Sequence, residues 1–166
     1  MSVIAQAGAK GRQLHKFGGS SLADVKCYLR VAGIMAEYSQ PDDMMVVSAA
    51  GSTTNQLISW LKLSQTDRLS AHQVQQALRR YQSELISGLL PPEVADGLIG
   101  AFIHDLERLA GLLDSGVNDA VYAEVVGHGE VWSARLMSAV LNQQGLESAW
   151  LDARDFLRAE RGAQPD

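Results

Sequence analysis

The sequence has a single cysteine, Cys27, among its 166 residues. One cysteine cannot form an internal disulfide, so the simpler expectation is a reducing compartment. No apolar stretch approaches the roughly 20 residues that a membrane-spanning helix requires. Residues 1–11 also lack the long apolar segment of a secretory signal. We therefore expect a cytoplasmic protein without membrane contact, in which residues 1–11 form a flexible leader.

Basic residues are also scarce. The net charge is −5, and the longest basic run is the pair Arg79-Arg80. Binding along a nucleic-acid backbone relies on clustered Lys and Arg, so nucleic acid is not expected as the main partner. Apolar residues make up 46% of the chain and charged residues 20%, which is typical of a soluble globular domain with its own core.

The first part of the chain alternates between strand and helix patterns. Residues 12–17 predict a short strand that ends at Gly18-Gly19, and the following helix, with Ser20 or Ser21 as its cap, reaches about Tyr38. Residues 44–47 are wholly apolar between polar flanks, which is typical of a buried parallel strand. A loop of small residues and another helix follow.

The middle of the chain is strongly helical. Residues 71–89 and 93–114 each carry apolar side chains on one helical face, and Pro91-Pro92 separates them. We interpret residues 71–115 as a helical hairpin inserted between β/α units.

Helical patterning resumes after Gly116, is interrupted at residues 127–129 and continues over residues 131–142, while residues 149–151 predict a third buried strand. Strands that alternate with helices predict an α/β fold with a mainly parallel sheet. Because three strands leave a sheet edge exposed, we expect residues 12–166 to be an incomplete portion of a domain.

The first candidate site lies at a strand-to-helix junction and consists of Lys16, Phe17, Gly18, Gly19, Ser20 and Ser21. Glycines let backbone N–H groups approach an anion, a helix N-terminus adds N–H donors, and a lysine adds a full charge. These features suit a polyphosphate, although the order differs from the G-x-x-x-x-G-K-[ST] loop. A Gly-Gly turn with a serine cap explains the same residues without a ligand.

The second candidate site, residues 48–55, follows the second predicted strand and reads Ser-Ala-Ala-Gly-Ser-Thr-Thr-Asn. Ligands of open parallel sheets bind at the carboxyl ends of the strands, so both loops are expected to face one crevice. The hydroxyl groups can donate to a carboxylate or a phosphate. A loop that caps a helix through Thr53 or Thr54 is the alternative interpretation.

The third candidate is Gly127-His128-Gly129-Glu130. Each glycine within a helical pattern costs roughly 1 kcal/mol relative to alanine, which favours a close backbone approach at this place. We expect Glu130 to open the next helix, where its carboxylate can hold an ammonium group. A helix–helix turn with an acidic first-turn residue is the alternative. No second His or Cys stands at ligand spacing from His128, so we expect no metal site.

These three segments, in this order, resemble the aspartokinase family. Its signatures read roughly K-F-G-G-T-S, S-A-x-x-x-x-T-N and G-E at a helix start, and they match Lys16–Ser21, Ser48–Asn55 and Gly129-Glu130. The resemblance covers about residues 12–160 and is greatest to the bifunctional, methionine-branch members of enteric bacteria, which also carry a homoserine dehydrogenase. It implies a three-layer sandwich of the amino-acid-kinase type.

The resemblance also implies an activity, namely transfer of the ATP γ-phosphoryl group to the β-carboxylate of L-aspartate, with Mg²⁺ carried by the nucleotide. It implies that Lys16 is catalytic and contacts the transferring group, and that Phe17, Gly18 and Gly19 line the ATP phosphates. Ser48, Thr54 and Glu130 are implied to bind aspartate, Glu130 through the substrate ammonium. The parent protein is expected to be a homo-oligomer.

Two departures from the family pattern matter. Ser20 replaces the signature threonine and keeps its hydroxyl. The family's Gly-Arg-Gly-Gly-Ser-Asp-like segment and its base and ribose contacts come after the point matched by Asp166, so we expect the chain alone to be inactive. The alternative functions are another amino-acid kinase, acting on a different small carboxylate, and a non-catalytic assembly module that uses residues 71–114 as a subunit contact.

Overall fold

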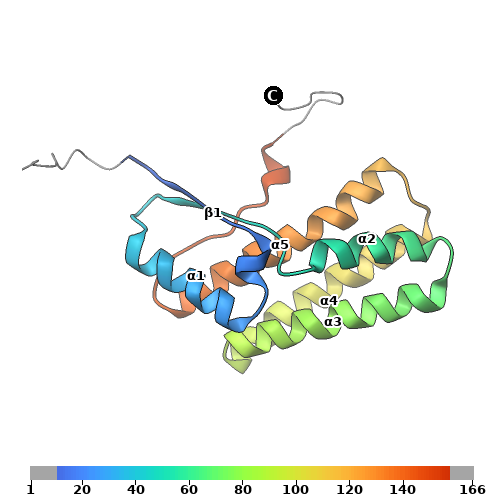
Figure 1. Cartoon of the computed structure of the whole chain (residues 1–166), viewed down its shortest axis with the longest axis horizontal. Helices are drawn as coiled ribbons and strands as arrows, with labels where there is room; N and C mark the ends of the chain where they lie inside the picture. The colour runs from blue at the N-terminus through green and yellow to red at the C-terminus, as the bar shows by residue number, and fades with distance from the viewer. Residues whose placement is uncertain (1–10, 158–166) are drawn as a thin grey trace, which may run out of the picture.

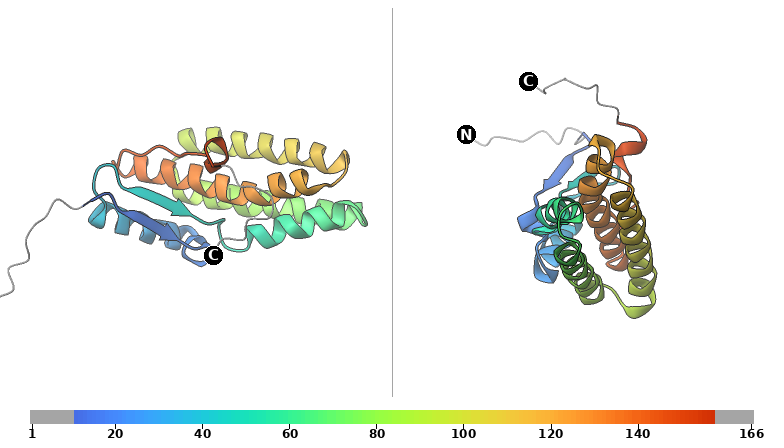
Figure 2. Two further views of the ribbon diagram at one scale, coloured as in Figure 1. Left: turned by 90° about the horizontal axis from the view of Figure 1, so that it is seen from above. Right: turned by 90° about the vertical axis from the view of Figure 1, so that its right-hand side faces the viewer.

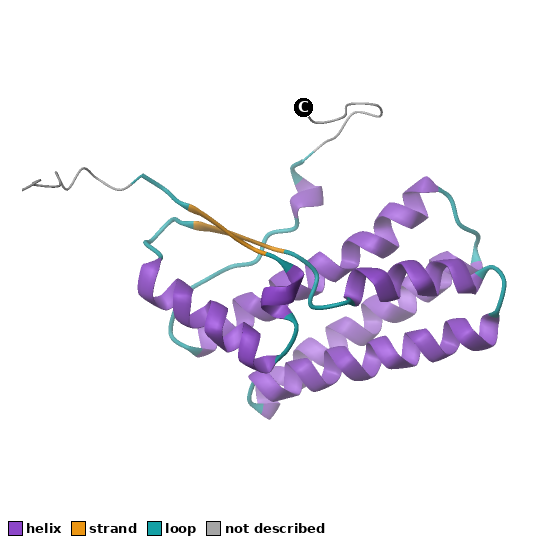
Figure 3. Cartoon of the chain, in the orientation of Figure 1, coloured by secondary structure: helices purple, strands orange, loops and turns teal. Residues whose placement is uncertain are grey.

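The computed structural model describes residues 11–157, so the predicted leader, apart from Gly11, lies outside the described residues. The described elements, shown in Figures 1 and 3, are β1 (Leu14–Phe17), the 3-10 turn η1 (Gly19–Leu22), α1 (Val25–Tyr38), β2 (Met44–Val47), α2 (Thr53–Ser64), α3 (Arg68–Leu89), α4 (Pro92–Asp114), α5 (Asp119–Gln143) and the 3-10 turn η2 (Ala153–Asp155).

The two strands pair in parallel, with Lys16 opposite Val46 and Phe17 opposite Val47. The predicted α/β class with a parallel sheet and a helical hairpin is confirmed. The prediction that the second strand is wholly buried is wrong, because only one face of the sheet packs on the helices. Phe17 and Val47 contact the core from that face, whereas Met44 and Val46 are 53% and 45% exposed on the other.

Helix α5 is central to the packing. It contacts α1, α2, α4 and β2, and Figure 2 shows α3 and α4 running side by side as a hairpin away from the sheet. The fully buried core side chains include Tyr28, Leu57, Leu109, Leu136 and Met137. Within residues 11–157 no helix is both long and apolar enough to cross a bilayer.

The first long helix begins later than predicted. Residues Gly19–Leu22 form a 3-10 turn, and α1 starts at Val25 with the Asp24 carboxylate accepting from the Cys27 N–H at 2.8 Å. A carboxylate at this position satisfies an otherwise unpaired helix donor. The prediction that Ser20 or Ser21 caps the helix is therefore wrong.

Helix α5 is continuous from Asp119 to Gln143, so the predicted interruption at residues 127–129 is wrong. The flanking side chains Val125 and Trp132 are buried in the core, and this burial offsets the low helix propensity of the glycines.

The predicted third strand at residues 149–151 is also wrong. This segment has no regular structure; the preceding Ser148 exchanges hydrogen bonds with Asn142, and Trp150 stacks on the Arg135 guanidinium at 4.6 Å. Its backbone therefore follows α5 instead of joining the sheet.

Candidate functional site

The site forms where the two parallel strands end. The Ser48 N–H donates to the Phe17 carbonyl at 3.0 Å, and the Gly51 N–H donates to the Gly19 carbonyl at 3.0 Å. The loop after β2, residues 48–52, is thus tied by its backbone to the loop after β1. The two loops that were predicted to face one crevice therefore lie side by side, and the crevice itself stays a prediction.

Lys16 stands at the exposed rim of these loops. Its Nζ lies 3.4 Å from Ser48 Oγ, and a Cβ at Gly18 would lie 3.8 Å from the same nitrogen. The ammonium group therefore folds over Gly18 toward the second loop while it remains open to solvent. An exposed cation beside a hydroxyl is suited to an anion.

Two glycines in these loops are required, one by close packing and one by its backbone conformation. A Cβ at Gly19 would lie 2.7 Å from the Ala49 carbonyl oxygen, a distance that side chains do not tolerate. Gly51 has a φ of 52°, in the left-handed region that favours glycine. The structure therefore explains Gly19 by a protein contact, and its predicted role beside the ATP phosphates stays a prediction.

Ser20 and Ser21 lie in the 3-10 turn directly after Gly19. Ser20 is exposed, and Ser21 is half-buried with its N–H donating to the Gly18 carbonyl at 3.0 Å. Both hydroxyls stay close in sequence to Lys16, and their predicted contact with nucleotide phosphates stays a prediction.

Glu130 reaches the site from the middle of α5, so the prediction that it opens a helix is wrong. Its Oε1 accepts from the Ala49 N–H at 3.4 Å. Ser48 and Ala49 are adjacent, and the structure therefore brings the Lys16 ammonium and the Glu130 carboxylate to the same two residues.

The approach of α5 depends on Gly129. A Cβ there would lie 2.7 Å from Ala49 Cβ and 3.3 Å from Thr53 Cγ2. The predicted close backbone approach is confirmed at this glycine. It is wrong for Gly127, where a Cβ would meet nothing within 4 Å.

Thr54 lies half-buried in the first turn of α2. Its neighbour Thr53 is fully buried and donates from Oγ1 to the Ala50 carbonyl at 2.6 Å. The N-cap of α2 is Ser52, so the alternative in which Thr53 or Thr54 caps this helix is wrong. The role of Thr54 in aspartate binding stays a prediction.

His128 has a structural role. It is buried, its Nδ1 donates to the Glu124 carbonyl at 2.7 Å, and its Nε2 therefore accepts from Arg108 Nη2 at 2.8 Å. Burial lowers the pKa of this imidazole below its usual 6.5. Among residues 11–157 no group of three His, Cys, Asp or Glu side chains could hold a metal ion.

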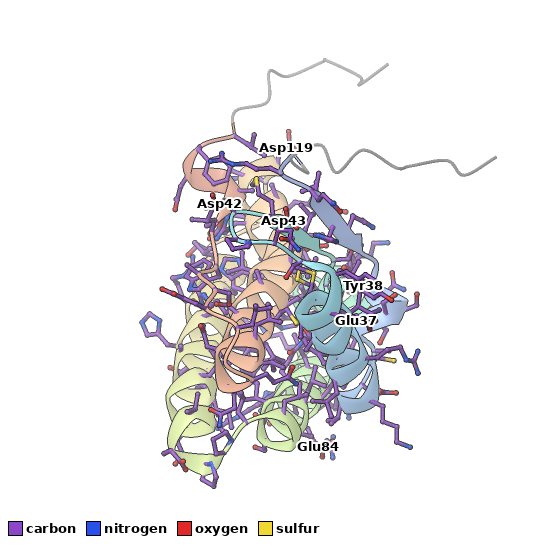
Figure 4. All side chains as sticks on the ribbon, turned by 90° about the vertical axis from the view of Figure 1, so that its left-hand side faces the viewer. Glu37, Tyr38, Asp42, Asp43, Glu84 and Asp119 are labelled. Carbon is purple, nitrogen blue, oxygen red and sulfur yellow. The ribbon has the colours of Figure 1, made fainter. Side chains whose placement is uncertain are left out.

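The sequence analysis did not predict the polar contacts of Asp43, which lie at the opposite end of the strands. Asp43 accepts from the Gln13 and Gln40 N–H groups at 2.7 and 2.9 Å and pairs with His15 Nε2 at 3.2 Å. These backbone donors lower the pKa of the Asp43 carboxyl. Figure 4 shows Asp43 beside Asp42 in the turn that enters β2. The position of Asp43 directly before β2 was the sequence feature that could have indicated these contacts.

Comparison with known proteins identifies close relatives. A sequence model described as the Amino acid kinase family matches residues 11–165. Bifunctional aspartokinase/homoserine dehydrogenase 2 of Escherichia coli (strain K12) is 90% identical over 165 residues, which are 99% of this chain and 20% of that protein. Lysine-sensitive aspartokinase 3 of the same strain is 28% identical over 155 residues, 91% of this chain and 34% of that protein. The chain thus spans a minor part of both relatives.

Solved structures agree with this result. The structure of E. coli aspartokinase III in complex with aspartate and ADP (R-state) matches with a TM-score of 0.79 and 26% identity, covering 93% of this chain and 35% of that one. The complex of the same enzyme with lysine and aspartate (T-state) matches with a TM-score of 0.80 at 24% identity, which shows a shared fold.

Proposed function

The chain belongs to the amino acid kinase family, and we propose that it forms the aspartate-binding and phosphate-binding part of a cytoplasmic aspartate kinase. The enzyme transfers the γ-phosphoryl group of ATP to the β-carboxylate of L-aspartate, the step that commits aspartate to amino-acid biosynthesis. The relative that shares 90% identity is named as a bifunctional aspartokinase, which supports this proposal.

One observation carries the proposal: Lys16 Nζ and the Glu130 carboxylate meet at neighbouring residues, 3.4 Å from Ser48 Oγ and 3.4 Å from the Ala49 N–H respectively. Aspartate carries an ammonium group and two carboxylates, so it needs both signs of charge within one small site. Glu130 suits the ammonium, Lys16 suits the reacting anions, and Ser48 supplies a hydroxyl beside Lys16. We assign Thr54, in the first turn of α2, to the same substrate.

Phosphoryl transfer to aspartate depends more on electrostatic stabilisation than on a general base. The β-carboxylate of aspartate is already ionised at neutral pH and needs no proton removed. The barrier lies in bringing this anion to the γ-phosphate. Lys16 and the backbone N–H groups after β1 oppose that repulsion and stabilise the charge that develops during transfer.

We assign Mg²⁺ to the nucleotide. Mg²⁺ keeps several water ligands and is commonly held through substrate phosphates with one or two carboxylates. An ADP-bound relative of the same fold supports a nucleotide co-substrate.

A chimera tests the proposal, with this chain replacing the matching 165 residues of the 90% identical E. coli relative. We expect it to form aspartyl phosphate, trapped as the hydroxamate, and to prefer aspartate over glutamate. Lys16→Ala is expected to abolish the reaction, whereas Arg30→Ala, which removes an exposed cation on α1, is expected to leave it intact.

Near-normal turnover in Lys16→Ala contradicts the role of the lysine, and a preference for glutamate favours the other amino-acid kinases. The proposed enzyme is a homo-oligomer, which light scattering on the chimera measures. Assembly without any kinase activity favours a non-catalytic assembly module.

A further inference from the structure

The loop after β2 is held from a third side, by α3. Gln82 of that helix is 3% exposed, and its Nε2 donates to Thr53 Oγ1 at 3.0 Å. Thr53 in turn donates to the Ala50 carbonyl at 2.6 Å. The helical hairpin therefore reaches the loop through a buried chain of two hydrogen bonds.

The Gln82 amide fixes the direction of these two consecutive hydrogen bonds. Because Thr53 Oγ1 accepts from the Gln82 amide, its own proton points to Ala50. Consecutive hydrogen bonds of one direction polarise and strengthen each other. This arrangement sets the loop conformation between Ala49, which Glu130 contacts, and Thr54.

Tyr81, the neighbour of Gln82, holds the same region from another point. Its hydroxyl donates to the Ala23 carbonyl at 2.9 Å, in the connection between η1 and α1. A Cβ at Gly51 would lie 2.8 Å from this hydroxyl oxygen. Tyr81 thus lies between the segment that follows Lys16 and the loop that carries Ser48.

We propose that Gln82 and Tyr81 are positioning residues that fix the substrate loop of the kinase from the helical hairpin. Neither side chain is among the residues that we propose to bind a substrate. Gln82 acts through Thr53 and Ala50 on the aspartate side, and Tyr81 sets the spacing between the two loops. The inference rests on the proposed function, since it assumes that residues 48–54 bind aspartate.

Kinetics in the chimera test the inference. Gln82→Met keeps the side-chain length and removes the amide, and the KM for aspartate is expected to rise roughly tenfold, as for loss of one buried hydrogen bond. The KM for ATP is expected to stay within about twofold, because the Lys16 loop does not contact Gln82. In a Thr53→Val background the effect of Gln82→Met should vanish, since the two residues act as one unit. Tyr81→Phe is expected to raise both KM values.

Leu78→Ala is the control, because Leu78 is fully buried on the same helix and makes no hydrogen bond to the loop. It is expected to lower Tm without changing the ratio of the two KM values. If Gln82→Met and Leu78→Ala give the same ratio of the KM for aspartate to the KM for ATP, the inference is overturned while the proposed function stands.

Hydrogen exchange in the chimera gives a readout that needs no kinase activity. The Thr53 amide donates to the Ala50 carbonyl, and Gln82→Met is expected to speed its exchange more than Leu78→Ala does. Unchanged exchange at this amide rejects the inference. A chimera that forms no hydroxamate in its unmodified form rejects the proposed function itself.

Discussion

Two glycines in α5 stand two positions apart and have opposite surroundings. Gly129 packs against the loop that carries Ala49, whereas Gly127 has open space where a side chain would begin. The helical cost of glycine is the same at both. Only Gly129 is therefore required by a contact.

Alanine substitutions separate these two cases. Gly127→Ala is expected to stabilise the chain by about 0.5–1 kcal/mol, because alanine loses less backbone entropy in a helix. Gly129→Ala is expected to destabilise it by about 1–3 kcal/mol, because the added methyl group collides with Ala49. Urea unfolding followed by circular dichroism measures both, and equal effects of the two substitutions contradict the assigned packing.

Glu130 makes a charge-specific prediction. Glu130→Gln retains an oxygen that can accept from the Ala49 N–H but removes the negative charge. We expect the KM for aspartate in the chimera to rise about tenfold or more, since a charged hydrogen bond is lost, with little change in the KM for ATP. Glu84→Gln, which changes an exposed carboxylate on α3 (labelled in Figure 4), is the matched control. A similar rise of the KM for aspartate in both variants would contradict the assignment of Glu130 to the aspartate site.

At the scale of the element, α5 combines a site residue with a polar network around one buried imidazole, that of His128. Arg108 of α4 donates both to His128 and to Glu124, and Arg154 also pairs with Glu124, at 2.8 Å. The neutral imidazole is the form that fits, because its Nε2 accepts from a cation. Protonation of His128 would place its Nε2–H donor against the Arg108 N–H donor, where the imidazole is buried.

This network predicts a pH-dependent stability. The pKa of His128 is lower in the folded chain than its unfolded value of 6.5, so the unfolded chain binds more protons as the pH falls. The contribution of His128 is fully present above pH 6.5 and declines below it. We expect Tm to fall more between about pH 6.5 and 5 in the unmodified chain than in His128→Gln, which keeps an acceptor for Arg108.

Substitution of the exposed His72 by Gln controls for the loss of a histidine. Calorimetric scans across this pH range should show the same fall of Tm with pH in the His72 variant as in the unmodified chain. If His128→Gln shows that fall as well, the buried imidazole is not its cause.

At the scale of the whole molecule, the sheet is open on one side. Leu14, Met44 and Val46 are 65%, 53% and 45% exposed on its outer face, and the chain spans 20% of its 90% identical relative. The described residues bring Lys16 to the loop that carries Ser48. As the resemblance to the aspartokinases implies, we expect the nucleotide base and ribose to be bound by a segment outside these residues.

We therefore expect the 166-residue chain alone to form no aspartyl hydroxamate, while the chimera does. Without the rest of the nucleotide site, the γ-phosphate is not held in line with the carboxylate, and positioning supplies most of the catalysis in phosphoryl transfer. ATP-dependent hydroxamate formation by the isolated chain, absent in its Lys16→Ala variant, overturns this expectation.

Periodicity and turn residues act over a few positions, and they were enough to predict two parallel strands, the helical hairpin and the two polar loops at the strand ends. The folded structure was needed to show that Glu130 reaches Ala49 across 81 positions, that Gly129 and not Gly127 makes a close contact, and that Gln82 supports the loop through Thr53. Such contacts depend on how distant segments pack. The continuity of α5 has the same origin, since burial outweighed the local preference of its glycines.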